Sequence, residues 1–142
     1  MAEPSHDIPP TRVVELVVNL DDASGERVGH ACKSLMDAGA LDVWTTPITM
    51  KQGRPGAMLS ALAAEDDRQR LSRLLLESTG SFGLRTRVWD RQVLDRSWET
   101  VETRLGTLRL KVGRLDGQIV SVKSEFTEVA ALALPNEPNI GR

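Results

Sequence analysis

Cysteine, histidine and aromatic residues are scarce in this sequence of 142 residues. The single cysteine, Cys32, excludes an internal disulfide and a cysteine-rich zinc site. The two histidines, His6 and His30, are too few for a nickel or zinc cage built from imidazoles. Aromatic residues make up 4%, tyrosine is absent and the formal net charge is −2, so the composition argues against a nucleic-acid-binding protein.

Long hydrophobic runs are also missing. No stretch is long and apolar enough to span a membrane, and the first ten residues, MAEPSHDIPP, do not resemble a signal peptide. We therefore expect no membrane partner and a cytoplasmic location. The prolines of the opening stretch predict a flexible leader over residues 1–11, and the last residues predict a short frayed tail over 127–142.

The residues that remain are typical of a packed domain, since 40% are hydrophobic and 27% are charged. Hydrophobic periodicity predicts alternating strands and helices. The predicted elements are a strand at 12–20, a helix with an apolar stripe at 28–36, strands at 41–50 and 57–64, a helix from about residue 66, and a strand at 84–94. The order βαββαβ predicts an α+β, ferredoxin-like sandwich over residues 12–94.

Residues 95–126 do not fit within that unit. They predict three further short strands, and the Asp116-Gly117 pair is a strong signal for a hairpin between two of them. We expect a small antiparallel β appendage or an extension of the same sheet. The three tryptophans, Trp44, Trp89 and Trp98, are expected to be core residues or interface anchors.

Polar residues with possible chemistry follow the first strand at Asn19, Asp21 and Asp22. One interpretation is a turn and a helix N-cap, in which the carboxylates complement the helix dipole. The other is a site for a hard divalent cation, because Mg²⁺ and Mn²⁺ prefer oxygen ligands and often carry a nucleotide phosphate. Both interpretations stay open at this point.

A basic turn, Lys51-Gln52-Gly53-Arg54-Pro55-Gly56, separates the strands at 41–50 and 57–64. It is either a solvated hairpin or a cradle for an anion. Gly53 and Gly56 allow the backbone to approach a ligand closely. Lys51 and Arg54 supply a point charge and a planar fork for phosphate or carboxylate. Further cations lie at Arg85, Arg87, Lys111 and Lys123, and each alone is typical of a solvated strand face.

Several stretches occur together in the order and spacing of one known family. They are VVELVVNLDDASGE, LMDAGALDVWTTPITMKQGRPG, ESTGSFGLR and GTLRLKVGRLDGQIVSVKSEF. On these stretches the sequence resembles the C-terminal domain of LarC, the nickel insertion protein family for the nickel-pincer nucleotide cofactor. The resemblance runs from about Val13 to Phe126. One departure is Lys123-Ser124-Glu125-Phe126, where related sequences tend to read Lys-Pro-Glu-Tyr.

The resemblance implies CTP-dependent insertion of nickel into pyridinium-3,5-bisthiocarboxylic acid mononucleotide, in a reaction of the lyase or chelatase type. The C-terminal domain is the part associated with binding CTP together with Mn²⁺ or Mg²⁺, and with homo-oligomerisation. On this basis the metal ligands are expected at Asp21 and Asp22. The nucleotide or phosphate is expected at Lys51, Gly53, Arg54, Gly56, Arg85 and Lys123.

The resemblance does not include the histidine-rich, nickel-bearing N-terminal half of the family. Nickel, the substrate metal, is therefore expected to be held by a separate N-terminal half and not by this domain alone. We expect no independent insertion activity without that half. The alternative function is a non-catalytic ferredoxin-like module for oligomerisation or small-molecule binding.

Overall fold

The computed structural model describes residues 11–104, 106–124 and 129. The predicted leader, apart from Thr11, and the predicted tail, apart from Val129, lie outside the described residues. The chain divides into a larger unit, Pro10–Arg91, and a smaller unit whose described residues begin at Gln92.

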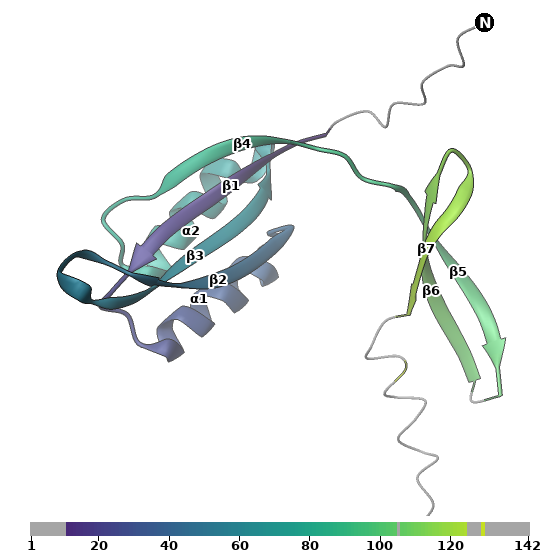
Figure 1. Ribbon diagram of the computed structural model, residues 1–142, viewed down its shortest axis with the longest axis horizontal. Coiled ribbons are helices and arrows are strands. Elements are labelled where there is room, and N and C mark those ends of the chain that lie inside the picture. Colours follow the sequence, from purple (N-terminus) through teal and green to yellow (C-terminus); the bar gives the residue numbers. More distant parts are fainter. Residues whose placement is uncertain (1–10, 105, 125–128, 130–142) are drawn as a thin grey trace, which may run out of the picture. The chain divides into compact units, whose positions relative to one another are not determined.

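The larger unit has the predicted βαββαβ order (Figure 1). Its elements are β1 (Thr11–Leu20), α1 (Gly25–Asp37), β2 (Asp42–Thr49), the 3₁₀ turn η1 (Lys51–Gly53), β3 (Pro55–Ala64), the 3₁₀ turn η2 (Glu65–Asp67), α2 (Arg68–Thr79) and β4 (Arg85–Arg91). The sheet order is β2-β3-β1-β4, and every neighbouring pair is antiparallel. The predicted α+β, ferredoxin-like class is confirmed.

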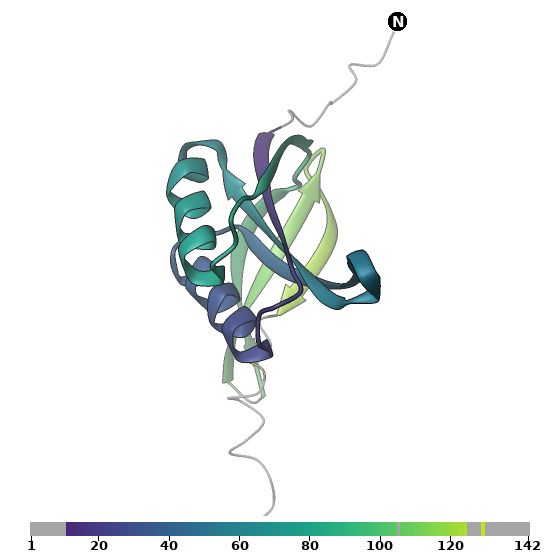
Figure 2. The same cartoon turned by 90° about the vertical axis from the view of Figure 1, so that its left-hand side faces the viewer.

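The core lies between the sheet and the two helices, which cover the same face of the sheet (Figures 1 and 2). Alternate residues of β1 and β3 point into it, because successive side chains of a strand point to opposite faces. The fully buried members include Leu16 of β1, Leu59 of β3, Leu35 of α1, and Leu71 and Leu75 of α2. Neither helix of the described part is long and apolar enough to cross a bilayer.

A glycine with positive φ follows each helix: Gly39, with φ of 93°, comes after the Ala38 cap of α1, and Gly80, with φ of 71°, is the cap of α2. Only glycine adopts this conformation without steric cost, which explains why the helices end there. The proline of β2, Pro47, lies in an edge strand of the sheet. An edge strand tolerates proline because one side of its backbone needs no donor.

The smaller unit is a separate sheet in the order β5-β6-β7. Its strands are β5 (Asp95–Thr103), β6 (Gly106–Leu115) and β7 (Gln118–Ser124). Asp116 and Gly117 have φ of 51° and 77°, and two successive positive φ values are typical of the tight turn that joins two twisted strands. The predicted hairpin is confirmed.

The tryptophans are not core residues, so that half of the expectation is wrong. Trp44, Trp89 and Trp98 are 36%, 40% and 46% exposed. The indole N–H of Trp89 donates to Oε2 of Glu15 at 2.8 Å, and Arg87 stacks over its ring at 4.1 Å from the centroid. These polar partners satisfy the indole at the surface, where burial is not required.

Gly56 is expected to be essential for the pairing of β1 with β3. A Cβ atom at this position would lie 2.6 Å from the carbonyl oxygen of Leu20, which is a backbone atom that cannot move aside. We expect Gly56→Ala to lower the free energy of unfolding by about 1–3 kcal/mol, measured by urea denaturation.

The matched control is Gly29→Ala, inside α1, where a Cβ would meet nothing within 4 Å. Alanine favours a helix over glycine by roughly 0.5–1 kcal/mol, so this variant should be more stable. Equal stability of the two variants would show that the close approach at Gly56 imposes no constraint.

Candidate functional site

The end of β1 meets the basic turn between β2 and β3 (Figure 1). Leu20, the last residue of β1, pairs with Ala57 of β3, because the two strands run antiparallel. This pairing places Asp21 beside the turn, and its Oδ2 lies 3.6 Å from Nη1 of Arg54. The carboxylate and the guanidinium that sequence reasoning singled out separately therefore meet within one chain.

The helix-cap interpretation of the carboxylates is wrong. The N-cap of α1 is Ser24, whose Oγ accepts a hydrogen bond from the backbone N–H of Arg27 at 3.3 Å. Asp21 instead faces Arg54, and its side chain is 20% exposed. The side chain of Asp22 is exposed and makes no hydrogen bond or ion pair with any described residue. Neither carboxylate is needed to complete the helix.

The carboxylates alone do not form a complete metal site. Within residues 11–104, 106–124 and 129, no group of three or more histidine, cysteine, aspartate or glutamate side chains is placed to hold a metal ion. The side-chain oxygen of the neighbouring Asn19 already accepts a hydrogen bond from Arg85. Mg²⁺ is commonly held by one or two carboxylates plus substrate phosphates. Asp21 and Asp22 fit that arrangement, in which a ligand supplies the remaining oxygens.

The basic turn is strongly curved and exposed. Gln52 and Gly53 have φ of 63° and 71°, and both flanking cations, Lys51 and Arg54, are exposed. Gly56 has a structural reason of its own, because it allows the close approach to the Leu20 carbonyl. A role of the Gly53 and Gly56 backbone in holding a ligand stays a prediction.

Arg85 is fixed on the face of the four-stranded sheet that the helices leave uncovered. Its Nη2 donates to Oδ1 of Asn19 at 3.0 Å and lies 3.9 Å from Sδ of Met58. Arg85, Arg87 and Met58 line a shallow hollow of about 390 Å³ on this face. Asn19, which lies two residues before Asp21, thus positions the guanidinium of Arg85. Sequence reasoning had not assigned this role to Asn19.

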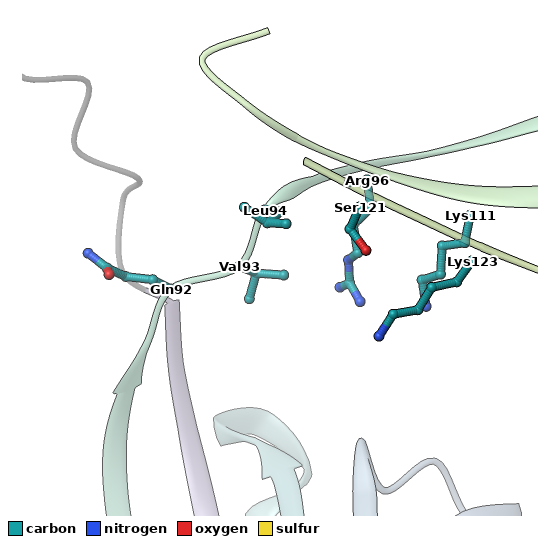
Figure 3. A pocket seen from close by; sticks show the side chains of 8 residues that line it. Gln92, Val93, Leu94, Arg96, Lys111, Ser121 and Lys123 are labelled. Carbon is teal, nitrogen blue, oxygen red and sulfur yellow. The ribbon is translucent and has the colours of Figure 1, made fainter. Parts of the chain in front are cut away.

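Lys123 belongs to the smaller unit, where it lines a second hollow of about 340 Å³ (Figure 3). The residues around this hollow are Gln92, Val93, Leu94, Arg96, Lys111, Gly113, Ser121 and Lys123. Lys123 and Lys111 are direct cross-strand partners. Sequence reasoning had not singled out Arg96. Strand alternation places Arg96 on the same face of the sheet as Trp98, two residues along, and Trp98 is the cross-strand partner of Lys111.

Comparisons with known proteins all indicate the same family. The family model for nickel insertion proteins matches residues 2–140. The pyridinium-3,5-bisthiocarboxylic acid mononucleotide nickel insertion protein of Geobacillus kaustophilus is 34% identical over 122 residues, covering 86% of this chain and 30% of the relative. The protein of the same name in Lactiplantibacillus plantarum is 36% identical over 121 residues, covering 85% and 29%. The chain thus spans about 30% of the length of these curated relatives.

A solved structure is similar over nearly its whole length. It is LarC2, described as the C-terminal domain of a cyclometallase involved in the synthesis of the NPN cofactor of lactate racemase, in its apo form. The TM-score is 0.83 at 34% sequence identity, and the match covers 89% of this chain and 87% of that one. The family model and the two relatives lead to the same conclusion as this fold: the chain belongs to the nickel insertion protein family.

Proposed function

We propose that this chain is the CTP- and divalent-metal-binding C-terminal part of a nickel insertion protein that makes the nickel-pincer nucleotide cofactor. The names of its relatives support the reaction, and the similar solved domain is the C-terminal domain of a cyclometallase for that cofactor. The substrate metal, nickel, would be held with a separate N-terminal half. The described part of this chain offers no cluster of side chains for it.

The observation that carries the proposal is the contact between Asp21 and Arg54. A metal–triphosphate complex needs a carboxylate for the cation and a guanidinium for the phosphate oxygens, a few ångströms apart. The 3.6 Å contact is long for an ion pair, and Arg54 is 58% exposed while the Asp21 side chain is 20% exposed. Exposed ion pairs contribute only about 0–1 kcal/mol, so a ligand can replace the contact at little cost.

The charged residues near the contact between Asp21 and Arg54 then have distinct roles in binding. Asp21 and Asp22 hold the divalent cation, while Lys51 and Arg54 neutralise the phosphate oxygens. Arg85, oriented by Asn19, is available for a further phosphate of the triphosphate. The cation, when bound, screens the charge of the triphosphate against an incoming anionic group. The protein thus contributes positioning and charge neutralisation to cytidylyl or phosphoryl transfer and no covalent step.

Isothermal titration of the full chain with CTP and Mn²⁺ tests the proposal. Binding in the micromolar range is expected, which corresponds to about 8 kcal/mol. Asp21→Asn and Arg54→Gln should each weaken it by roughly tenfold, or about 1.4 kcal/mol, because each removes one charged partner of the complex. Chelation of Mn²⁺ by EDTA should abolish it.

The matched control is Arg73→Gln, which removes an exposed cation of α2 that is paired with Glu77. It changes the net charge as Arg54→Gln does but lies outside the proposed site. No heat with the unmodified chain, or an equal loss in Arg54→Gln and Arg73→Gln, would contradict the proposal.

A second property, homo-oligomerisation, is favoured by the apolar face of the smaller unit. Val101 and Val122, on the outer strands of this sheet, are 37% and 52% exposed. They flank Leu108 and Val112 of the central strand on one face. Val112 is itself buried, so the exposed part of this face lies over the two outer strands. Exposed apolar side chains of this kind are typical of a protein interface. We propose that this face packs against a second copy of the chain.

Light scattering after size-exclusion chromatography tests this. Val122→Asp should reduce the molar mass, because it places a charge in the apolar face. The control Thr100→Asp introduces the same charge on β5, at an exposed position on the opposite face of the sheet, and should leave the mass unchanged. A monomeric unmodified chain would refute the proposal.

A further inference from the structure

The hollow of the smaller unit has an unusual arrangement of charge. Lys111 of β6 and Lys123 of β7 face each other across the strands, and Figure 3 shows their side chains side by side. Arg96 of β5 lies on the same face, since it pairs with Gly113, which in turn pairs with Ser121. Three cations from three strands therefore surround one hollow.

This positive charge meets no carboxylate among the described residues, although Nζ of Lys111 lies 5.7 Å from the centroid of the Trp98 ring. No acidic side chain lines the hollow, and no described carboxylate pairs with Arg96, Lys111 or Lys123. Like charges directly opposite each other destabilise a pair of strands. The Trp98 ring offsets part of the charge of Lys111, and an anionic ligand would offset the repulsion that remains between Lys111 and Lys123.

The opposite wall of the hollow is aliphatic. Val93 and Leu94 line it, and Leu94 lies close over Gly113, where a Cβ atom would come within 2.9 Å of Cδ1 of Leu94. A volume of about 340 Å³ is within the range of small-molecule sites. Cations on one side and aliphatic carbon on the other suit an anion that also carries a ring.

We propose that this hollow binds the pyridinium mononucleotide substrate, at a site separate from that of the metal–CTP complex. The inference rests on the function proposed above. The substrate named in the relatives carries a phosphate and two thiocarboxylates on a ring, so several anionic groups must be matched. The hollow supplies cations but no carboxylate for a metal ion, whereas Asp21 and Asp22 lie in the other unit. The two charge patterns favour two different ligands.

Titration of the full chain with nicotinic acid mononucleotide, in EDTA, tests the assignment with a stable pyridinium mononucleotide. Binding without a metal is expected, and Lys111→Gln and Lys123→Gln should each weaken it about tenfold. The control Lys33→Gln removes a cation of α1 that is paired with Asp37 and should change nothing. Binding of CTP with Mn²⁺ should be unchanged in Lys111→Gln and Lys123→Gln.

The outcomes separate this inference from the proposed function. If CTP with Mn²⁺ does not bind but the mononucleotide does, and the lysine variants weaken it, the inference stands and CTP binding fails. If the lysine variants weaken CTP binding instead, the hollow is a triphosphate site and the inference is overturned. Absence of mononucleotide binding to the unmodified chain, or equal weakening in Lys33→Gln, also overturns it.

A charge reversal gives a second readout. Lys123→Glu replaces the opposed lysines by an opposite-charge pair, so we expect a higher denaturation midpoint together with loss of mononucleotide binding. A lysine with a purely structural role would not give both a higher denaturation midpoint and a loss of mononucleotide binding on this substitution. A lower midpoint, or retained binding, would overturn the inference.

Discussion

The larger unit depends on the antiparallel pairing of β1 with β3. β1 is bonded on both sides, to β3 and to β4, and its inward residues form one wall of the core. The close approach of Gly56 to the Leu20 carbonyl marks one end of this pairing, where β3 begins directly after the basic turn. The register that aligns the core residues is therefore the same register that places Asp21 beside Arg54. Stability and site geometry have one common cause.

Much of this fold could be predicted, because local patterns encode it. The valines of β1, the spaced apolar residues of α1 and the Asp116-Gly117 pair each indicate one element through the chemistry of a few neighbouring residues. The order of elements then limits the topology to a few possibilities.

The remaining features depend on contacts between distant residues. The sequence alone did not establish that the 3.6 Å approach of Asp21 to Arg54 occurs within one chain, because that requires knowing that β3 is the neighbour of β1. Similarly, the polar residues after β1 did not reveal that the helix is capped by Ser24, because the cap depends on where the helix begins. The surface position of Trp89 depends on Glu15, a residue 74 positions away, which offers its indole a polar partner.

Pro47 also affects how copies of the chain can associate. A strand added to the free edge of β2 would need a complete row of backbone donors, and proline removes one of them from that row. Extension of the four-stranded sheet along this edge, into a continuous sheet or a fibre, is disfavoured. Strand pairing between larger units is thereby directed away from this edge and toward β4, the other edge strand of the sheet.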